Sequence, residues 1–228
     1  MQFSCDRAQL AESVDLVSAA AASKSTKKIF ECLRMKADDE GLELTATVLE
    51  VAVRRRLPDV KVDEPGVEVV SAALFAVTLR STPDETVSVR SAKRKVTLET
   101  DGGQFEFEGE DPGDFPEIPC FPPEPTVKIP AEELRTLVRK TSFATAREAT
   151  RFALNGVRIL AGSGKVTFVA TDGRRLAVAT LPAPDGAVGE EEGVRSAIVA
   201  VKGVNQFEKA AAQIEAPVDL ALGERFVA

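Results

Sequence analysis

The second half of this chain repeats the first half at a nearly constant spacing, and this duplication constrains the fold more than any other feature. Three pairs of matching residues lie 124 positions apart: Leu10 and Leu134, Leu33 and Val157, and Ala46 and Ala170 (134 − 10 = 124). Each pair lies in a similar local pattern of apolar and polar residues. We therefore expect two copies of one structural unit.

The spacing of the repeat grows toward the C-terminus, where matching positions are 131 apart (218 − 87 = 131). Extra residues must therefore lie within the second copy, and the acidic segment 183–193, rich in turn-forming residues, is the predicted insertion. On this register the last residue corresponds to Thr97. We therefore expect the second copy to lack a counterpart of the predicted strand Gln104–Glu108.

Each copy is predicted to be an α+β unit with two helices packed on antiparallel sheet. Residues 8–22 carry apolar side chains at helical spacing, with Asp6 as a possible N-cap, and Ala72–Arg80 fits a second helix. Short β-rich segments predict the strands of the first copy: Phe30–Ala37, Leu42–Thr47, Val51–Leu57, Thr86–Ser91, Lys95–Thr100 and Gln104–Glu108. The Asp101-Gly102-Gly103 sequence predicts a hairpin turn.

The segment 111–125 contains six prolines, which remove backbone donors and restrict φ. It is interpreted as a semi-rigid connector between a first domain, 1–123, and a second domain, 124–228. A long surface loop within a single domain is the alternative interpretation.

Composition excludes several classes of function. The chain has no histidine, so imidazole general bases, Ser-His or Cys-His nucleophile pairs and histidine-bearing metal sites are impossible. Cys5, Cys32 and Cys120 match neither a zinc spacing nor a disulfide framework, and we expect three buried thiols in a reducing cytoplasm. No export signal or membrane span is expected, and no metal or cofactor is assigned. The net charge of −7 predicts a surface that largely repels nucleic acid.

Four segments carry a resemblance to the bacterial sliding clamp family, the beta subunit of DNA polymerase III. They are Met1–Leu10, Gly113–Ile118, Arg151–Val157 and Ala170–Ala177, in the order in which that family has them. The resemblance covers essentially the whole chain. It implies a non-enzymatic processivity factor whose repeated domains close head to tail into a ring around duplex DNA in the bacterial cytoplasm, at the nucleoid. We expect this chain to hold the first domain and most of the second, with the third absent.

The resemblance places helices on the wall of the DNA channel, where sequence-independent phosphate contacts are needed. Position by position, the resemblance matches Lys24 and Phe152 to DNA-contacting residues of the family, and the further candidate DNA-contacting residues are the cations Lys27, Arg135, Arg139 and Lys202. The spacing of Arg135 and Arg139 puts both cations on one helical face. A merely solvated helix surface is the alternative for each of them. The first predicted helix carries Glu12 and Asp15 and offers no phosphate contact.

The resemblance also assigns a groove that takes short hydrophobic motifs from polymerases, the clamp loader and repair proteins. Its residues here are Leu154, Thr171, Gly173, Arg174, Arg175 and Leu176. We expect a tight turn in which Gly173 adopts positive φ and Leu176 points toward an apolar pocket. An ordinary hairpin turn is the alternative.

The resemblance also implies a contact with the third domain of another subunit, through Leu74, Thr78, Phe105 and Phe107. As plain core residues these four would need no partner. The principal functional hypothesis is a sliding clamp that encircles DNA and tethers its partners. A second is a truncated clamp relative that binds peptides or regulates without encircling DNA. An unrelated enzyme is a remote third, because no nucleophile arrangement is present.

Overall fold

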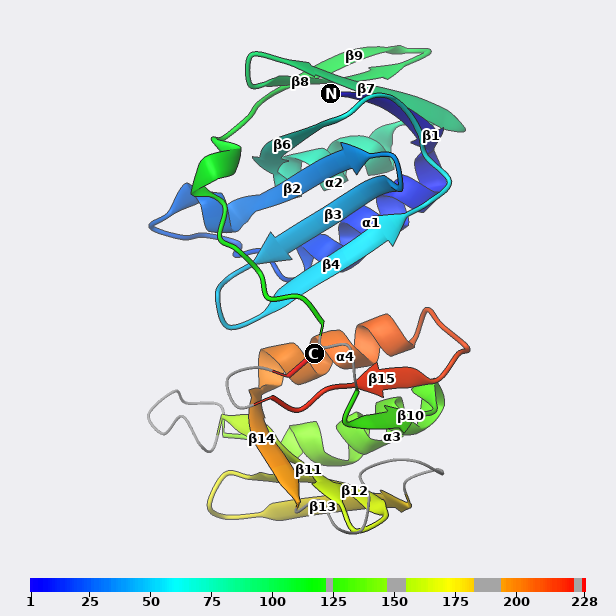
Figure 1. The fold of residues 1–228 in the computed structure, drawn as a ribbon. Helices are drawn as coiled ribbons and strands as arrows, with labels where there is room; N and C mark the ends of the chain where they lie inside the picture. The colour runs from blue at the N-terminus through cyan, green and yellow to red at the C-terminus, as the bar shows by residue number, and fades with distance from the viewer. Residues whose placement is uncertain (122–124, 147–154, 183–193, 224–226) are drawn as a thin grey trace. The chain divides into compact units, whose positions relative to one another are not determined.

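The computed structural model describes residues 1–121, 125–146, 155–182, 194–223 and 227–228. The chain divides into two compact units, Met1–Ile118 and Pro119–Ala228. Each unit combines helices with antiparallel sheet, as the ribbon in Figure 1 shows, and the predicted α+β class is confirmed.

The helical segments of the first unit are α1 (Arg7–Ser18), α2 (Ala72–Ser81) and the short 3₁₀ segments η1 (Lys28–Glu31) and η2 (Pro112–Asp114). Its strands are β1 (Gln2–Asp6), β2 (Cys32–Asp38), β3 (Gly41–Thr47), β4 (Ala52–Leu57), β5 (Lys61–Glu64), β6 (Gly66–Ser71), β7 (Thr86–Ala92), β8 (Lys95–Thr100) and β9 (Gly103–Glu108). Among the described residues they form two sheets, with strand orders β5-β1-β7-β8-β9 and β4-β3-β2-β6.

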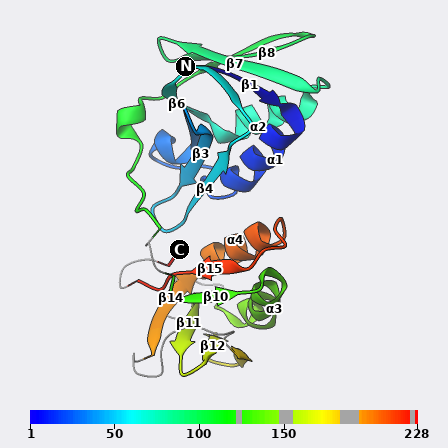
Figure 2. The same ribbon diagram turned by 45° about the vertical axis from the view of Figure 1, so that its right-hand side comes forward.

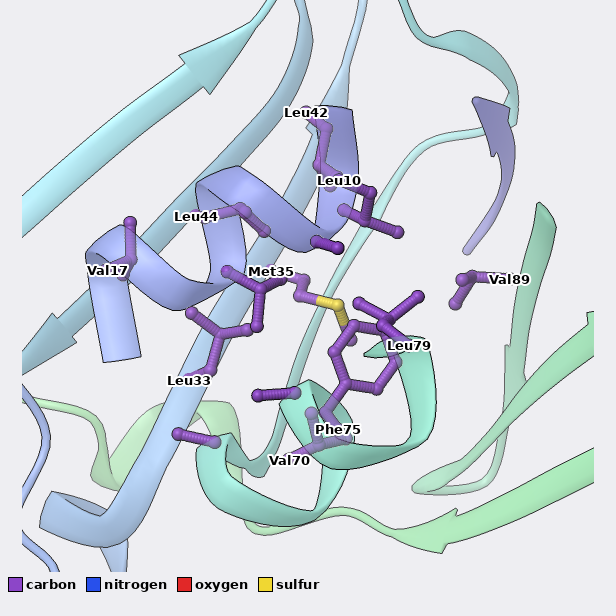
Figure 3. Packing of buried hydrophobic residues seen from close by; sticks show 14 of the residues in the cluster. Leu10, Val17, Leu33, Met35, Leu42, Leu44, Val70, Phe75, Leu79 and Val89 are labelled. Carbon is purple, nitrogen blue, oxygen red and sulfur yellow. The ribbon is translucent and has the colours of Figure 1, made fainter. Parts of the chain in front are cut away.

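The core of the first unit forms where α1 and α2 meet the strands. The Asp6 side chain accepts a hydrogen bond from the Gln9 amide at 2.8 Å and caps α1, as predicted. Figure 3 shows Leu10 of α1, Met35 of β2 and Phe75 of α2 converging in this core, where all three are fully buried. Burial of such side chains from distant segments is the main force holding helices and sheets together.

The second unit contains the helical segments α3 (Ala131–Thr141), η3 (Ser142–Ala144) and α4 (Val201–Ala211). Its strands are β10 (Val127–Ile129), β11 (Gly156–Gly162), β12 (Lys165–Thr171), β13 (Leu176–Pro182), β14 (Arg195–Ala200) and β15 (Val218–Leu220). The described strands pair in the orders β13-β12-β11-β14 and β10-β15. In Figure 2, α3 and α4 lie on the same side of this four-stranded sheet.

The internal duplication is confirmed by the element boundaries. Strand β11 begins 124 residues after β2 (156 − 32 = 124), and β12 begins 124 residues after β3 (165 − 41 = 124). The pairing registers also agree, because Arg34 lies opposite Val69 in the first unit and Arg158 lies opposite Ile198 in the second. The two units are therefore copies of one fold. The predicted insertion 183–193 lies outside the described residues.

Several predicted boundaries are wrong. Helix α1 ends at Ser18 rather than at residue 22, because the amides of Ala20 and Ala21 bond to carbonyls three residues back and tighten the chain into a turn. The strand expected from Phe30 begins at Cys32, after η1. Residues 58–71 carried no strand prediction but contain β5 and β6, since β5 is mostly charged and shows little apolar alternation.

The first part of the predicted connector belongs to the first unit. Phe115 is buried against Cys32 and Val69, and the Arg34 guanidinium lies 5.3 Å from the centre of the Phe115 ring. Arg54 donates a hydrogen bond to the carbonyl of Ile118 at 3.3 Å. These contacts hold residues 115–118 against the sheet β4-β3-β2-β6.

The expectation of three buried thiols is wrong for Cys120, which is exposed beyond the part of the connector held by the first unit. Cys5 and Cys32 are buried. Burial raises the pKa of the Cys5 thiol to about 12 and that of Cys32 to about 11, so both remain protonated at neutral pH.

Candidate functional site

The segment Thr171–Leu176 forms a tight turn between β12 and β13. Gly173 has φ of +87°, as expected, and an added Cβ would meet nothing within 4 Å. Glycine is therefore suited to this position by backbone conformation rather than by space. The Thr171 hydroxyl donates to the carbonyl of Arg175 at 2.7 Å and accepts from the amide of Gly173 at 3.0 Å.

Asp172 holds the other side of this turn. Its carboxylate accepts hydrogen bonds from the amides of Arg174 and Arg175, both at 3.0 Å, and from the Arg175 side chain at 2.9 Å. The two amide hydrogen bonds, followed by the nearby Arg175 charge, lower the pKa of Asp172 below its ordinary value. The turn is thus held in one conformation by an ionised carboxylate.

An apolar surface lies beside the turn. Leu176 is 67% exposed, and Leu154, which was expected beside it in an apolar pocket, lies outside the described residues. The alternation of β13 explains this exposure: Ala179 faces the core, whereas Leu176 and Val178 lie on the outward face. Phe143 of η3 is also exposed, and the Arg175 guanidinium lies 5.5 Å from the centre of its ring.

The structure brings together Thr171, Gly173, Arg175 and Leu176, and leaves the Arg174 side chain exposed. Leu154 and Phe152 lie outside the described residues. Phe143 and Val178 were not predicted as site residues, and only the tertiary packing of η3 beside the turn reveals the association of Phe143 with it. The apolar-polar alternation of β13 could have identified Val178.

The cations predicted on the helices of the second unit are partly neutralised. Arg135 forms an ion pair with Glu132 at 2.5 Å, and Arg139 of α3 forms one with Glu208 of α4 at 2.6 Å. Lys202 at the start of α4 is exposed and forms no ion pair within the described part of the chain. The helix carrying Arg135 and Arg139 ends at Thr141, so both cations lie within α3.

In the first unit, Lys24 and Lys27 lie in the exposed loop after α1, and neither forms an ion pair with another described residue. On the helices of this unit, Arg80 of α2 is paired with Asp15 of α1 at 2.7 Å. Lys24 and Lys27 on this loop are therefore free to meet phosphate, whereas Arg80 already has an acidic partner on α1.

The predicted subunit-contact residues separate into two groups. Leu74 on α2 and Phe105 on the edge strand β9 are exposed, and Thr78 is half-buried. Phe107 is buried and packs edge to face against Phe75, with ring centres 5.4 Å apart. Phe107 therefore serves the core, which is the alternative role considered for it.

The described residues contain no cluster of acidic residues and cysteines suited to a metal ion. None of the described helices is long and apolar enough to span a membrane.

Comparison with known proteins agrees with the duplicated fold. Residues 1–119 match the family model of the DNA polymerase III beta subunit, N-terminal domain, and residues 128–228 match that of the central domain. The beta sliding clamp of Vibrio cholerae is 30% identical, and that of Halalkalibacterium halodurans is 27% identical, each over 98% of this chain and 60% of the relative.

Solved structures give the same result. The DNA polymerase sliding clamp from Bacillus subtilis superposes with a TM-score of 0.91 at 24% identity. The DNA polymerase III subunit beta from Pseudomonas aeruginosa gives 0.89 at 26% identity. Each comparison covers 98% of this chain and 60% of the other, so the chain spans about 60% of the length of its relatives. The chain belongs to the DNA polymerase III beta subunit family and corresponds to its N-terminal and central domains.

Proposed function

We propose that this chain acts as part of a sliding clamp: a non-enzymatic ring, needing no cofactor, that encircles duplex DNA and tethers a replicative polymerase. The observation that carries the proposal is that both copies of the repeated unit match consecutive clamp domains along nearly the whole chain. The expected location is the bacterial cytoplasm, at the nucleoid.

A clamp must hold DNA and still slide, which requires phosphate contacts without recognition of base sequence. The exposed Lys24, Lys27 and Lys202 are suited to this role. Arg135 and Arg139 also contribute, but only once their ion pairs with Glu132 and Glu208 are broken. Phe152 is the remaining predicted DNA contact.

The ring is proposed to form by homo-oligomerisation. Leu74 and Phe105 are exposed apolar side chains on a helix and on an unpaired sheet edge, which supports a subunit contact at this end of the first domain. Thr78 lies one helical turn from Leu74. Phe107 is buried against Phe75 of α2, so it is proposed to support this subunit contact from within the core.

The turn Thr171–Leu176 is proposed to bind short hydrophobic motifs of the polymerase, clamp loader and repair proteins. Leu154 and Leu176 supply apolar contacts, and Arg174 and Arg175 supply donors. The ordered turn supports this proposal, because a preformed site reduces the entropy lost on binding.

Topological retention tests the main proposal. The protein is loaded onto nicked circular DNA with a clamp loader, separated by gel filtration, and the DNA is then linearised. A clamp remains with the circle and is released by linearisation, whereas equal retention on linear DNA contradicts encirclement.

A peptide-binding module that does not encircle DNA is the second candidate. The ion pairs of Arg135, Arg139 and Arg80 favour it, because they reduce the positive charge available to phosphate. This candidate predicts peptide binding without topological retention on the circle.

Peptide binding is tested with a labelled peptide of the pentapeptide clamp-binding type. The substitution Leu176→Asp should abolish binding, because it places a charge in the apolar contact. Leu49→Asp is the matched control, since Leu49 is 71% exposed in the first unit. Equal loss of binding in both variants would contradict a site at Leu176.

A further inference from the structure

The loop that follows α1 is held in one shape by backbone hydrogen bonds. The amide of Ala22 donates to the carbonyl of Phe30 at 2.8 Å, and the amide of Phe30 donates to the carbonyl of Lys27 at 3.1 Å. These bonds bring the two ends of the loop, residues 22–30, together. The loop carries Lys24 and Lys27, two of the proposed DNA contacts.

Glu31 of η1 holds the middle of this loop. Its carboxylate oxygen Oε1 accepts a hydrogen bond from the amide of Ser25 at 2.6 Å. The hydroxyl of Ser25 in turn accepts a hydrogen bond from the amide of Lys27 at 3.2 Å. The Ser25 amide belongs to the planar peptide group that follows Lys24, so the contact with Glu31 fixes the backbone at Lys24. The backbone at Lys27 is fixed one step further along, through Ser25.

The carboxylate of Glu31 is used for this amide rather than for an ion pair with a neighbouring lysine. Lys28 forms an ion pair with Glu110 at 2.7 Å, and no described acidic residue pairs with Lys24 or Lys27. Glu31 is half-buried, whereas Lys24 and Lys27 are exposed. The two lysine ammonium groups therefore remain available to phosphate while the backbone that carries them is held.

We propose that Glu31 is a positioning residue for DNA binding, an acidic side chain that strengthens the contact of this loop with phosphate. It contacts no phosphate itself. It holds the loop in the shape that presents Lys24 and Lys27, so part of the entropy cost of ordering the loop is met on folding rather than on DNA binding. This inference rests on the proposed clamp function, because it requires that these lysines contact DNA.

The charge of Glu31 and its hydrogen bond have opposite effects on DNA binding. A negative charge beside a DNA contact repels phosphate, so removal of the charge alone strengthens DNA binding. Loss of the hydrogen bond to the Ser25 amide releases the loop and weakens DNA binding. Two substitutions that remove the charge, one with and one without the acceptor oxygen, therefore separate the two effects.

Glu31→Gln and Glu31→Ala are this matched pair. Both remove one negative charge, but the glutamine side-chain oxygen can still accept the hydrogen bond from the Ser25 amide. We expect Glu31→Gln to bind duplex DNA at least as tightly as the unchanged chain, and Glu31→Ala to bind about three- to ten-fold more weakly than Glu31→Gln. The measurement is the dissociation constant of the full chain for a labelled duplex, by fluorescence anisotropy at low salt.

Glu12 on α1 provides the control pair, because its side chain is exposed and forms no ion pair or hydrogen bond with another described residue. Glu12→Gln and Glu12→Ala should bind DNA equally. Hydrogen exchange in the absence of DNA gives a second readout of the loop itself. The amides of Ser25 and Lys27 should lose protection in Glu31→Ala and keep it in Glu31→Gln.

A double-mutant cycle connects the effect to the two lysines. When Lys24 and Lys27 are both replaced by alanine, Glu31→Ala and Glu31→Gln should bind DNA equally, because no lysine remains to be positioned. A general loss of stability would instead weaken DNA binding in both backgrounds.

Circular dichroism establishes that each variant is folded, and Ser25→Ala provides a second test if Glu31→Ala is not. Ser25→Ala removes only the bond to the Lys27 amide and should weaken DNA binding about two-fold. In a chain that already carries Lys27→Ala, the same substitution should have no effect on DNA binding.

The outcomes separate this inference from the clamp proposal. If the unchanged chain does not bind duplex DNA, the proposed function and the inference fail together. If the chain binds DNA but Glu31→Ala and Glu31→Gln bind equally, only the positioning role is overturned. Unchanged DNA binding after replacement of Lys24 and Lys27, or a difference between the two Glu31 variants that persists without these lysines, also overturns it.

Discussion

Arg139 on α3 and Glu208 on α4 form an ion pair with 2.6 Å between Nε and Oε1. The two residues are far apart in the sequence, and the packing of the two helices brings them together. The hydrogen bond to Glu208 and the charge of Glu208 raise the pKa of Arg139. Arg139, which the sequence suggested as a DNA contact, therefore already has an acidic partner within the protein.

Glu208→Gln should strengthen binding to duplex DNA at low salt, because it releases Arg139 to contact phosphate. The measurement is the dissociation constant as a function of salt concentration, and the salt dependence should become steeper. Glu133→Gln is the matched control: it removes the same charge from an exposed position of α3 where no described ion pair is present. An equal gain in both variants would show that net charge alone is responsible.

Leu10→Ala and Leu134→Ala should each destabilise one unit by about 2–5 kcal/mol, because each leaves a cavity in a packed core. The two leucines are equivalent in the repeat and almost fully buried. Denaturant unfolding followed by residue-resolved hydrogen exchange should show loss of protection confined to the substituted unit. Loss of protection in both units to the same extent would contradict two separately packed cores.

Gly173→Ala should destabilise the second unit by about 1–2 kcal/mol, because an alanine is strained at positive φ even where space is open. The same substitution at Gly164, with φ of +68° in the hairpin between β11 and β12, should cost a similar amount. Thermal unfolding measures both effects. Only Gly173→Ala should weaken peptide binding, and equal weakening by Gly164→Ala would assign the loss to stability.

Asp38 should titrate at a pKa of about 2, because hydrogen bonds from Lys36 and then Arg56 favour its ionised form. Since the pKa is lower in the folded state, the associated stability is present above about pH 4 and is lost as the pH falls toward about 2. Carboxyl carbon chemical shifts measure the titration. Asp38→Asn should remove this pH dependence, and a normal pKa for Asp38 would contradict the hydrogen-bonded geometry.

The duplicated fold could be predicted because matching residues recur at one spacing, and a repeated pattern buries a repeated core. The helices carried clear apolar periodicity and the Asp6 cap. Strand β5 could not be predicted, because three of its four residues are charged and its pairing with β1 depends on residues far away in the chain. Local patterns do not contain that information.

The candidate site was predictable in its turn but not in its surroundings. Gly173 and Asp172 act through hydrogen bonds within a few residues, so their local sequence determines the conformation. Phe143 reaches the turn only through packing between elements, and the partners of Arg139 and Phe115 depend on the same kind of contact. Val178 lies two residues after Leu176 on β13, so its outward position follows from the alternation of that strand.

The amino-acid sequence by itself determined the two-unit α+β architecture, the exclusion of histidine chemistry and the tight turn after β12, because these follow from composition and short-range pattern. Only the tertiary structure decided which cations remain free and which face of each sheet is covered. Ion pairs and burial depend on distances between residues that the chain order does not contain. That is why the burial of Val69 beneath Phe115 could not be predicted from the order of the residues along the chain.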